Sequence, residues 1–259
     1  LNGFEPAAHA LAWDGLLSLD RWILLRAAQL QDEIRRAYTD YEFHLIYQKA
    51  HNFCPVDLGA FYLDIIKDRQ YTTRADSRAR RSAQTALHHL VEAMVRWIAP
   101  ILSFTAEDLW QHIPGKRGDS VFLEEWYGGL PAVDGLSSDA AVGRLLEAWN
   151  PVIEVRMAVS KELEKLRVGG AIGASLDAEV DLYCDDGLRR HLGTLGDELR
   201  FVLITSYARV HAAGDRPVDA IEAAAAGEAF WIKTQASTHP KCVRCWHHRA
   251  DVGYDDAHP

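Results

Sequence analysis

Apolar residues recur every three to four positions through almost all of the stretch from residue 18 to about residue 113. Such spacing is typical of amphipathic α-helices, in which one face is apolar and the other is solvated. The expected helices cover residues 19–34, 43–53, 58–66, 87–98 and 105–110. Because these helices follow one another through short connections, we predict that residues 1–115 form an antiparallel helical bundle.

Individual residues are expected to fix where these helices begin and end. Ser18 is placed to cap the first helix, because a serine side chain accepts a hydrogen bond from the free N–H groups of a first turn. Pro55 is expected to end the second helix and Pro100 to end or kink the fourth, since proline lacks a backbone donor. Thr105 with Asp108 resembles a capping box that opens the short fifth helix.

Glycine and proline become frequent after the bundle, so that residues 116–139 are predicted to be a loop-rich connector. Phe122 and Trp126 are expected to anchor this connector onto the bundle. Residues 140–238 combine apolar residues at helical spacing with short runs that alternate as strands do, and this combination predicts a small α+β module. Within the module we expect helices at 140–166, 187–195 and 197–204, and strands at 178–182, 207–211 and 230–235.

The overall composition is that of a globular protein. The chain has 259 residues, of which 48% are apolar, enough for one large domain or two to three small ones. No stretch approaches the roughly 18 apolar residues of a membrane span, and no secretion signal is recognisable. Four cysteines, only two of them close in sequence, favour reduced thiols. We therefore expect a cytoplasmic location and no membrane partner.

The segment from residue 67 to residue 81 is basic, although the whole chain has a net charge of −9. It contains six Lys or Arg against two Asp, and Tyr71 lies within it. One interpretation is a solvated helical face balanced by Asp68 and Asp76. The other is an RNA-binding site, because unpaired RNA bases stack on aromatic rings while arginines contact the phosphates. The residues alone leave both interpretations open.

Cys242 and Cys245 are separated by two residues close to the end of the chain. Two thiolates at this spacing can bind one tetrahedral zinc ion, but no second cysteine pair follows. A redox dithiol or two structural cysteines are the alternatives, and Trp246 beside them is either a packing residue or a base-stacking platform. We predict that residues 239–259 are a truncated zinc-binding tail and that the chain is a piece of a longer protein.

Motifs that carry catalysis are absent from the sequence. It contains no G-x-x-x-x-G-K-[ST] phosphate loop, no G-x-G-x-x-G fingerprint, no G-x-S-x-G elbow and no H-E-x-x-H helix. We therefore predict no catalytic residue in this chain and assign it a role in binding.

A resemblance to a known family is carried by several stretches of the chain. They are residues 1–4 (LNGF), 19–22 (LDRW), 61–71 (FYLDIIKDRQY), 95–105 (VRWIAPILSFT), 195–203 (LGDELRFVL) and 241–247 (KCVRCWH). In their residues and order they resemble the anticodon-binding region and C-terminal part of bacterial isoleucyl-tRNA synthetases, which are class I enzymes. The final motif is the most particular to that family.

The resemblance implies a parent enzyme that joins isoleucine to its tRNA with ATP in one domain and removes valine in a separate editing domain. Neither domain is represented in this sequence, so ATP and Mg²⁺ would bind only outside it. The fragment is expected to be inactive alone. Its expected role is to bind the anticodon stem-loop of isoleucine tRNA, and the parent is expected to be monomeric.

The resemblance also implies site residues. Cys242 and Cys245 match the first of the family's two Cys-x-x-Cys pairs, so that half of a zinc site is present. Contacts with tRNA are predicted at Lys67, Arg69, Arg74, Arg81, Arg244 and Trp246. Asp64 and Asp68 are placed to form helix salt bridges with some of these cations. The alternatives are a zinc-dependent protein-interaction module that does not bind RNA, and a thiol redox protein.

Overall fold

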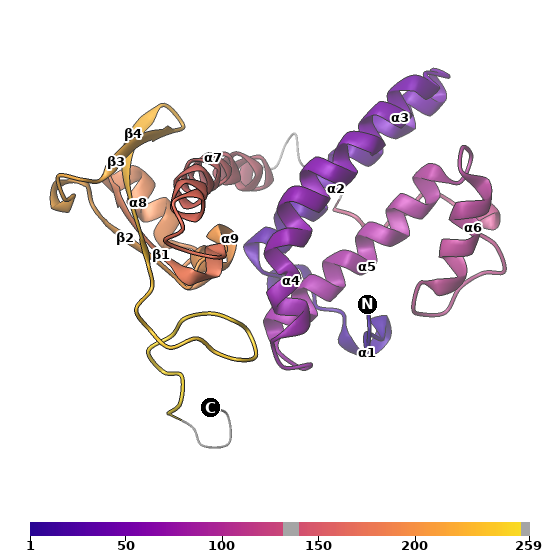
Figure 1. Cartoon of the computed structure of the whole chain (residues 1–259). Helices are drawn as coiled ribbons and strands as arrows, with labels where there is room; N and C mark the ends of the chain where they lie inside the picture. The colour runs from indigo at the N-terminus through magenta and orange to yellow at the C-terminus, as the bar shows by residue number, and fades with distance from the viewer. Residues whose placement is uncertain (132–139, 255–259) are drawn as a thin grey trace. The chain divides into compact units, whose positions relative to one another are not determined.

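The computed structural model describes residues 1–131 and 140–254. The chain divides into an N-terminal unit, Leu1–Leu146, and a C-terminal unit, Glu147–Pro259. The first is helical and the second contains a four-stranded sheet (Figure 1). The prediction of a mainly helical chain with a small α+β module is therefore confirmed. Part of the predicted connector, residues 132–139, lies outside the described residues.

The N-terminal unit is built around two long helices, α2 and α5, which contact each other (Figure 1). Helix α3 also packs on α2, and both α4 and α6 pack on α5. The elements are α1 (Pro6–His9), η1 (Trp13–Gly15), α2 (Ser18–Thr39), α3 (Phe43–Asn52), η2 (Phe53–Leu63), α4 (Asp64–Tyr71), α5 (Arg78–Ile98), α6 (Ser103–His112) and η3 (Val121–Leu123).

The core of this unit is formed by the predicted apolar stripes. Ile23 of α2, Tyr62 of η2 and Trp97 of α5 are almost completely buried. Two hydrogen bonds fix the polar atoms of the core: the Trp97 indole N–H donates to Gln31 Oε1 at 2.9 Å, and Tyr38 Oη donates to the Trp97 carbonyl at 2.7 Å. Burial of these rings helps to hold α2 and α5 together.

Three predictions about helix ends are wrong. Ser18 is not the N-cap of α2 but its first residue, and Leu17 occupies the N-cap position. Pro55 does not end a helix, because it lies within η2, a π-helix that joins α3 directly to α4. In a π-helix each backbone hydrogen bond reaches one residue further along the chain than in an α-helix. The wider turn lets the helix continue past Pro55, which has no N–H group to donate. Helix α6 begins at Ser103 without a side-chain cap, so the capping box at Thr105 does not form. The end of α5 at Ile98, just before Pro100, is confirmed.

The C-terminal unit is a mixed sheet with helices. Helix α7 (Ala140–Val168) begins in the first unit and continues into the second. It is followed by η4 (Ser175–Asp177), β1 (Ala178–Cys184), α8 (Asp186–Gly193), α9 (Glu198–Leu203), β2 (Tyr207–Ala212), η5 (Ala213–Asp215), β3 (Ile221–Ala225) and β4 (Glu228–Ala236). The strand order is β2-β1-β4-β3, with β1 parallel to β2 and antiparallel to β4.

Strands β1, β2 and β4 lie where the sequence predicts them, but β3 was missed. Its residues are mostly alanine, which is depleted in strands, and the segment has no alternation of apolar and polar residues. Pairing with β4 creates it, through a two-residue hairpin at Ala226 and Gly227, whose φ angles are 51° and 79°. Two consecutive positive φ values are those of the type I′ turn that suits the twist of a hairpin.

None of the helices in the described part of the chain is both long enough and apolar enough to cross a membrane.

Candidate nucleic-acid interface

The basic segment occupies the end of α4, the connection that follows it and the first turn of α5, which Ser77 caps by accepting a hydrogen bond from the Arg80 N–H. Lys67 and Arg74 keep 46% and 84% of their side chains exposed. Each forms a surface ion pair, Lys67 Nζ with Asp64 Oδ1 at 2.9 Å and Arg74 Nη2 with Asp76 Oδ2 at 3.1 Å. Because such exposed pairs are weak, a phosphate can replace the carboxylate.

A pocket of about 370 Å³ is lined by Lys67, whereas Arg74 is not among its lining residues. Its wall combines Lys67, Tyr71 and Arg80 with apolar side chains of α4 and α5. The Tyr71 ring is 81% exposed. An exposed ring next to two cations is suited to a stacked base and its phosphate. Arg80 was not among the predicted tRNA contacts, although its position in the basic segment pointed to such a role.

Arg69 is buried, which argues against the predicted contact with tRNA; that contact stays a prediction. Its side chain is 2% exposed, and its Nη1 lies 3.5 Å from Oδ2 of the fully buried Asp20. Asp20 also accepts hydrogen bonds from Tyr62 Oη at 2.7 Å and from Ser82 Oγ. Burial, reinforced by the Asp20 charge, raises the pKa of Tyr62 well above its ordinary value. Arg69 therefore belongs to a buried polar network that joins α2, η2, α4 and α5.

Arg81 is half-buried and is already engaged by the protein. Its Nη1 donates to the Gly3 carbonyl at 3.0 Å and to Gln84 Oε1 at 2.9 Å, so that it ties the N-terminal segment to α5. A role in tRNA binding stays a prediction for this residue. Another arginine of this turn, Arg78, makes a similar contact with the Gly15 carbonyl at 2.8 Å.

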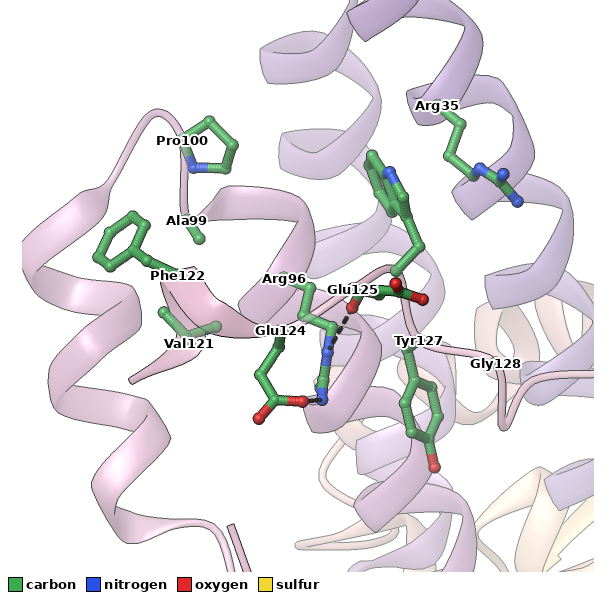
Figure 2. Close-up of a pocket in the computed structure, with 11 residues that line it drawn as sticks. Arg35, Arg96, Ala99, Pro100, Val121, Phe122, Glu124, Glu125, Tyr127 and Gly128 are labelled. Atoms are coloured by element: carbon green, nitrogen blue, oxygen red, sulfur yellow. Dashed lines mark hydrogen bonds and ion pairs between the residues drawn. The ribbon is translucent and has the colours of Figure 1, made fainter. Parts of the chain in front are cut away.

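A second pocket, of about 550 Å³, lies between α2, the end of α5 and the loop at 121–128 (Figure 2). Arg96 reaches the loop through Nε, which donates to the Glu125 carbonyl at 3.0 Å, and through Nη2, which lies 3.3 Å from Glu124 Oε2. The Arg35 guanidinium is 5.8 Å from the centre of the Trp126 ring. The sequence interpretation did not identify this pocket, because its parts come from three separate segments.

The predicted anchoring of the connector is only partly correct. Trp126 packs edge-on against Tyr38 of α2, with ring centres 5.8 Å apart. Phe122, in contrast, is 53% exposed and is one of the residues that line the pocket of Figure 2. The buried anchor is its neighbour Val121, which joins a core cluster with Trp110.

The tail after β4 forms a tight turn around the two cysteines. Lys241 and His248 form an antiparallel bridge, Cys242 N donates to the His247 carbonyl at 2.9 Å, and Trp246 N donates to the Cys242 carbonyl at 3.0 Å. Hydrogen bonds from the N–H groups of Cys245 and Arg244 hold the pKa of the Cys242 thiol below its usual range. The turn thus favours a thiolate, the form of cysteine that binds metals.

The described residues provide only two ligands for a metal at this turn. Among them there is no group of three or more His, Cys, Asp or Glu that could hold a metal ion. The histidines that follow are engaged elsewhere: His247 is buried with Nδ1 3.2 Å from Arg200 Nη1, and His248 Nδ1 lies 2.7 Å from the His239 carbonyl. His258, the remaining histidine after the cysteine pair, lies outside the described residues.

The tail is attached to the sheet through Asp177, just before β1. Its Oδ1 lies 2.9 Å from Lys241 Nζ and 3.3 Å from His248 Nε2. Burial raises the pKa of Asp177, but the hydrogen bonds from Lys241 and from two backbone N–H groups outweigh it and lower the pKa to about 2. This attachment leaves Arg244 and Trp246 on the surface, with Trp246 62% exposed.

Comparison with known proteins identifies the family. Residues 20–182 match the family model described as the anticodon-binding domain of tRNA ligase. The chain belongs to this family. The match contains the basic segment of this anticodon-binding domain, the pocket of Figure 2 and the buried network around Asp20. It also contains the pocket beside Lys67 except for Leu1 and Asn2.

Curated relatives extend the similarity of the anticodon-binding domain over the whole chain. The chain is 59% identical to the isoleucine–tRNA ligase of Nitrosococcus oceani, 58% to that of Alkalilimnicola ehrlichii and 56% to that of Thioalkalivibrio sulfidiphilus. Each alignment covers 100% of this chain and 27% of the relative. The chain thus spans about a quarter of the length of these relatives, and the tail with Cys242 and Cys245 is within the aligned region.

Proposed function

We propose that this anticodon-binding domain binds the anticodon stem-loop of isoleucine tRNA. The observation that carries the proposal is the pocket lined by Lys67 and the exposed Tyr71, with the exposed Arg74 three residues further along the same basic segment, which lies within the family match. The specificity for isoleucine tRNA is supported by the relatives, which are isoleucine–tRNA ligases. The whole protein would join isoleucine to tRNA with ATP. The 259 residues alone would bind tRNA without catalysing that reaction.

Filter binding with isoleucine tRNA tests this function. We expect the affinity to fall steeply as salt rises, because cations that neutralise phosphates release counterions from the RNA. A tRNA of the same body with a scrambled anticodon should bind less tightly. Equal affinity for both would refute the anticodon specificity, and binding that does not respond to salt would favour a protein-interaction module instead.

We also propose that Cys242 and Cys245 supply two of the four ligands of a structural zinc ion. The turn that lowers the pKa of the Cys242 thiol fits this chemistry, and two further ligands would have to come from outside the described residues. Metal analysis of the purified protein should show zinc that is lost in the Cys242→Ser/Cys245→Ser variant. A Cys54→Ser variant, which changes an exposed cysteine in the bundle, is the control and should retain the metal. Equal zinc content in all three proteins would contradict the assignment.

A further inference from the structure

Three aromatic or imidazole rings form a row across the sheet of the C-terminal unit. In the register of the sheet, Tyr183 on β1 lies directly opposite His211 on β2 and opposite Trp231 on β4. Residues paired in this way point to the same face. The Tyr183 and His211 rings are stacked, with centres 5.0 Å apart and planes 24° from parallel. We call His211, Tyr183 and Trp231 the ring row.

The ring row lies on the face of the sheet that the helices leave uncovered. The alternate residues Val180, Leu182 and Ile232 are at most 1% exposed and point to the opposite face. Helices α8 and α9 lie in the crossover between the parallel strands β1 and β2, so they share one face. Helix α7 joins the same layer, because the Ala148 carbonyl lies 2.5 Å from His191 Nε2 of α8 and Arg156 donates to the Val202 carbonyl of α9.

Cations border the ring row. The Arg216 guanidinium lies over the Trp231 ring, with its carbon 4.2 Å from the ring centre, so that it covers one of the two faces of this ring, and the arginine is exposed. Among the described residues no carboxylate pairs with it, and its Nη1 donates only to the Ala213 carbonyl at 3.0 Å. Lys233, two residues along β4 from Trp231, forms an ion pair with the exposed Asp219. Both cations can therefore reach a phosphate.

The row of residues next to the rings is fixed by internal ion pairs. Arg209 donates through Nε to Asp181 Oδ1 at 2.7 Å and through Nη2 to Glu179 Oε2 at 2.8 Å, while His211 Nε2 lies 2.8 Å from Asp181 Oδ1. Glu179 and Asp181 are thus paired within the protein, and Asp181 holds the imidazole of His211 in place beside Tyr183. Glu222 lies opposite Trp231 on β3 and is exposed, so that a carboxylate stands at the β3 end of the ring row.

We propose that the ring row stacks unpaired bases of an RNA strand, with Arg216 and Lys233 contacting its phosphates. The proposal rests on the tRNA-binding function proposed above and adds a second, separate contact surface. Adjacent strands are about 4.8 Å apart, so the three rings span roughly 10 Å, which is room for two to three bases. Because every base has a π-face, this surface would accept a loop of RNA with little regard to its sequence.

Fluorescence anisotropy of the full 259-residue chain with a short labelled single-stranded RNA tests the ring row. Tyr183→Leu and Trp231→Leu should each weaken binding about tenfold, because leucine keeps apolar volume but has no π-face. The slope of log affinity against log salt concentration should not change in these two variants, whereas Arg216→Ala should make that slope shallower by about one. Phe104→Leu is the matched control, since this ring is 93% exposed on the helical bundle. It should bind as the wild type does.

The outcomes separate this proposal from the proposed function. If Tyr183→Leu and Trp231→Leu are folded and bind both the short RNA and isoleucine tRNA as the wild type does, the ring row is refuted while tRNA binding stands. If the two variants lose affinity for the short RNA but anticodon scrambling has no effect, the ring row stands and the anticodon function fails. Should a variant not fold, ultraviolet crosslinking of the wild type decides. Crosslinks in peptides with Tyr183 or Trp231 support the proposal, and their absence refutes it.

Discussion

Replacing Arg69 with leucine is expected to lower the free energy of unfolding by about 3–5 kcal/mol. The reason is the burial of Asp20, which is fully inaccessible and would lose the guanidinium that lies 3.5 Å away. The remaining hydrogen bonds from Tyr62 and Ser82 can stabilise the carboxylate only in part. Chemical denaturation followed by circular dichroism gives the change directly.

Arg74→Leu is the matched control for this prediction. It removes the same group from the same segment, but at a side chain that is 84% exposed, so the free energy of unfolding should change by no more than about 0.5 kcal/mol. In tRNA binding the order should be reversed: Arg74→Leu should lower the affinity for isoleucine tRNA, whereas a folded Arg69→Leu protein should keep it. A stable Arg69→Leu protein that had lost tRNA affinity would show that Arg69 is a contact residue after all.

Replacing both Lys67 and Arg74 with alanine should weaken the binding of isoleucine tRNA about tenfold at low salt. If each cation neutralises one phosphate, the slope of log affinity against log salt should also become shallower by about two. The fold should be unaffected, because both side chains are exposed and their ion pairs with Asp64 and Asp76 are on the surface. Filter binding over a range of salt concentrations measures both effects.

A charge-matched control excludes a general effect of net charge. Arg36 and Arg167 are 72% and 56% exposed and likewise pair with nearby carboxylates, but neither is part of the basic segment. The double variant Arg36→Ala/Arg167→Ala should therefore bind tRNA almost as the wild type does. Equal losses in the two double variants would mean that the basic segment has no special role.

Helical periodicity was sufficient to predict the N-terminal unit, because burial of an apolar stripe is a local property of a sequence. Leu19, Trp22 and Ile34 are buried where that pattern places them. The same reasoning failed at Pro55, since the chain avoids the expected break by widening its turn into a π-helix. It also failed at β3, whose alanines become a strand only because β4 offers a partner.

The candidate site shows the same division between local and distant causes. That residues 67–81 carry cations and Tyr71 follows from the sequence, and Lys67 and Arg74 are exposed there. Arg69 looked equivalent, but it lies four residues after the buried Ile65 and so shares its face of α4. That spacing was a signal of burial, which a count of basic residues could not detect.

The helical bundle, three strands of the sheet and the family could be predicted because they depend on patterns along the chain. Which cations are exposed to RNA and which rings share a face depends instead on how distant segments pack. Asp20 is 49 residues from Arg69, and Tyr183 is 28 residues from His211 and 48 from Trp231 along the chain. The electrostatics of a buried charge and the alignment of rings across strands depend on distances in space, which neighbours in sequence do not specify.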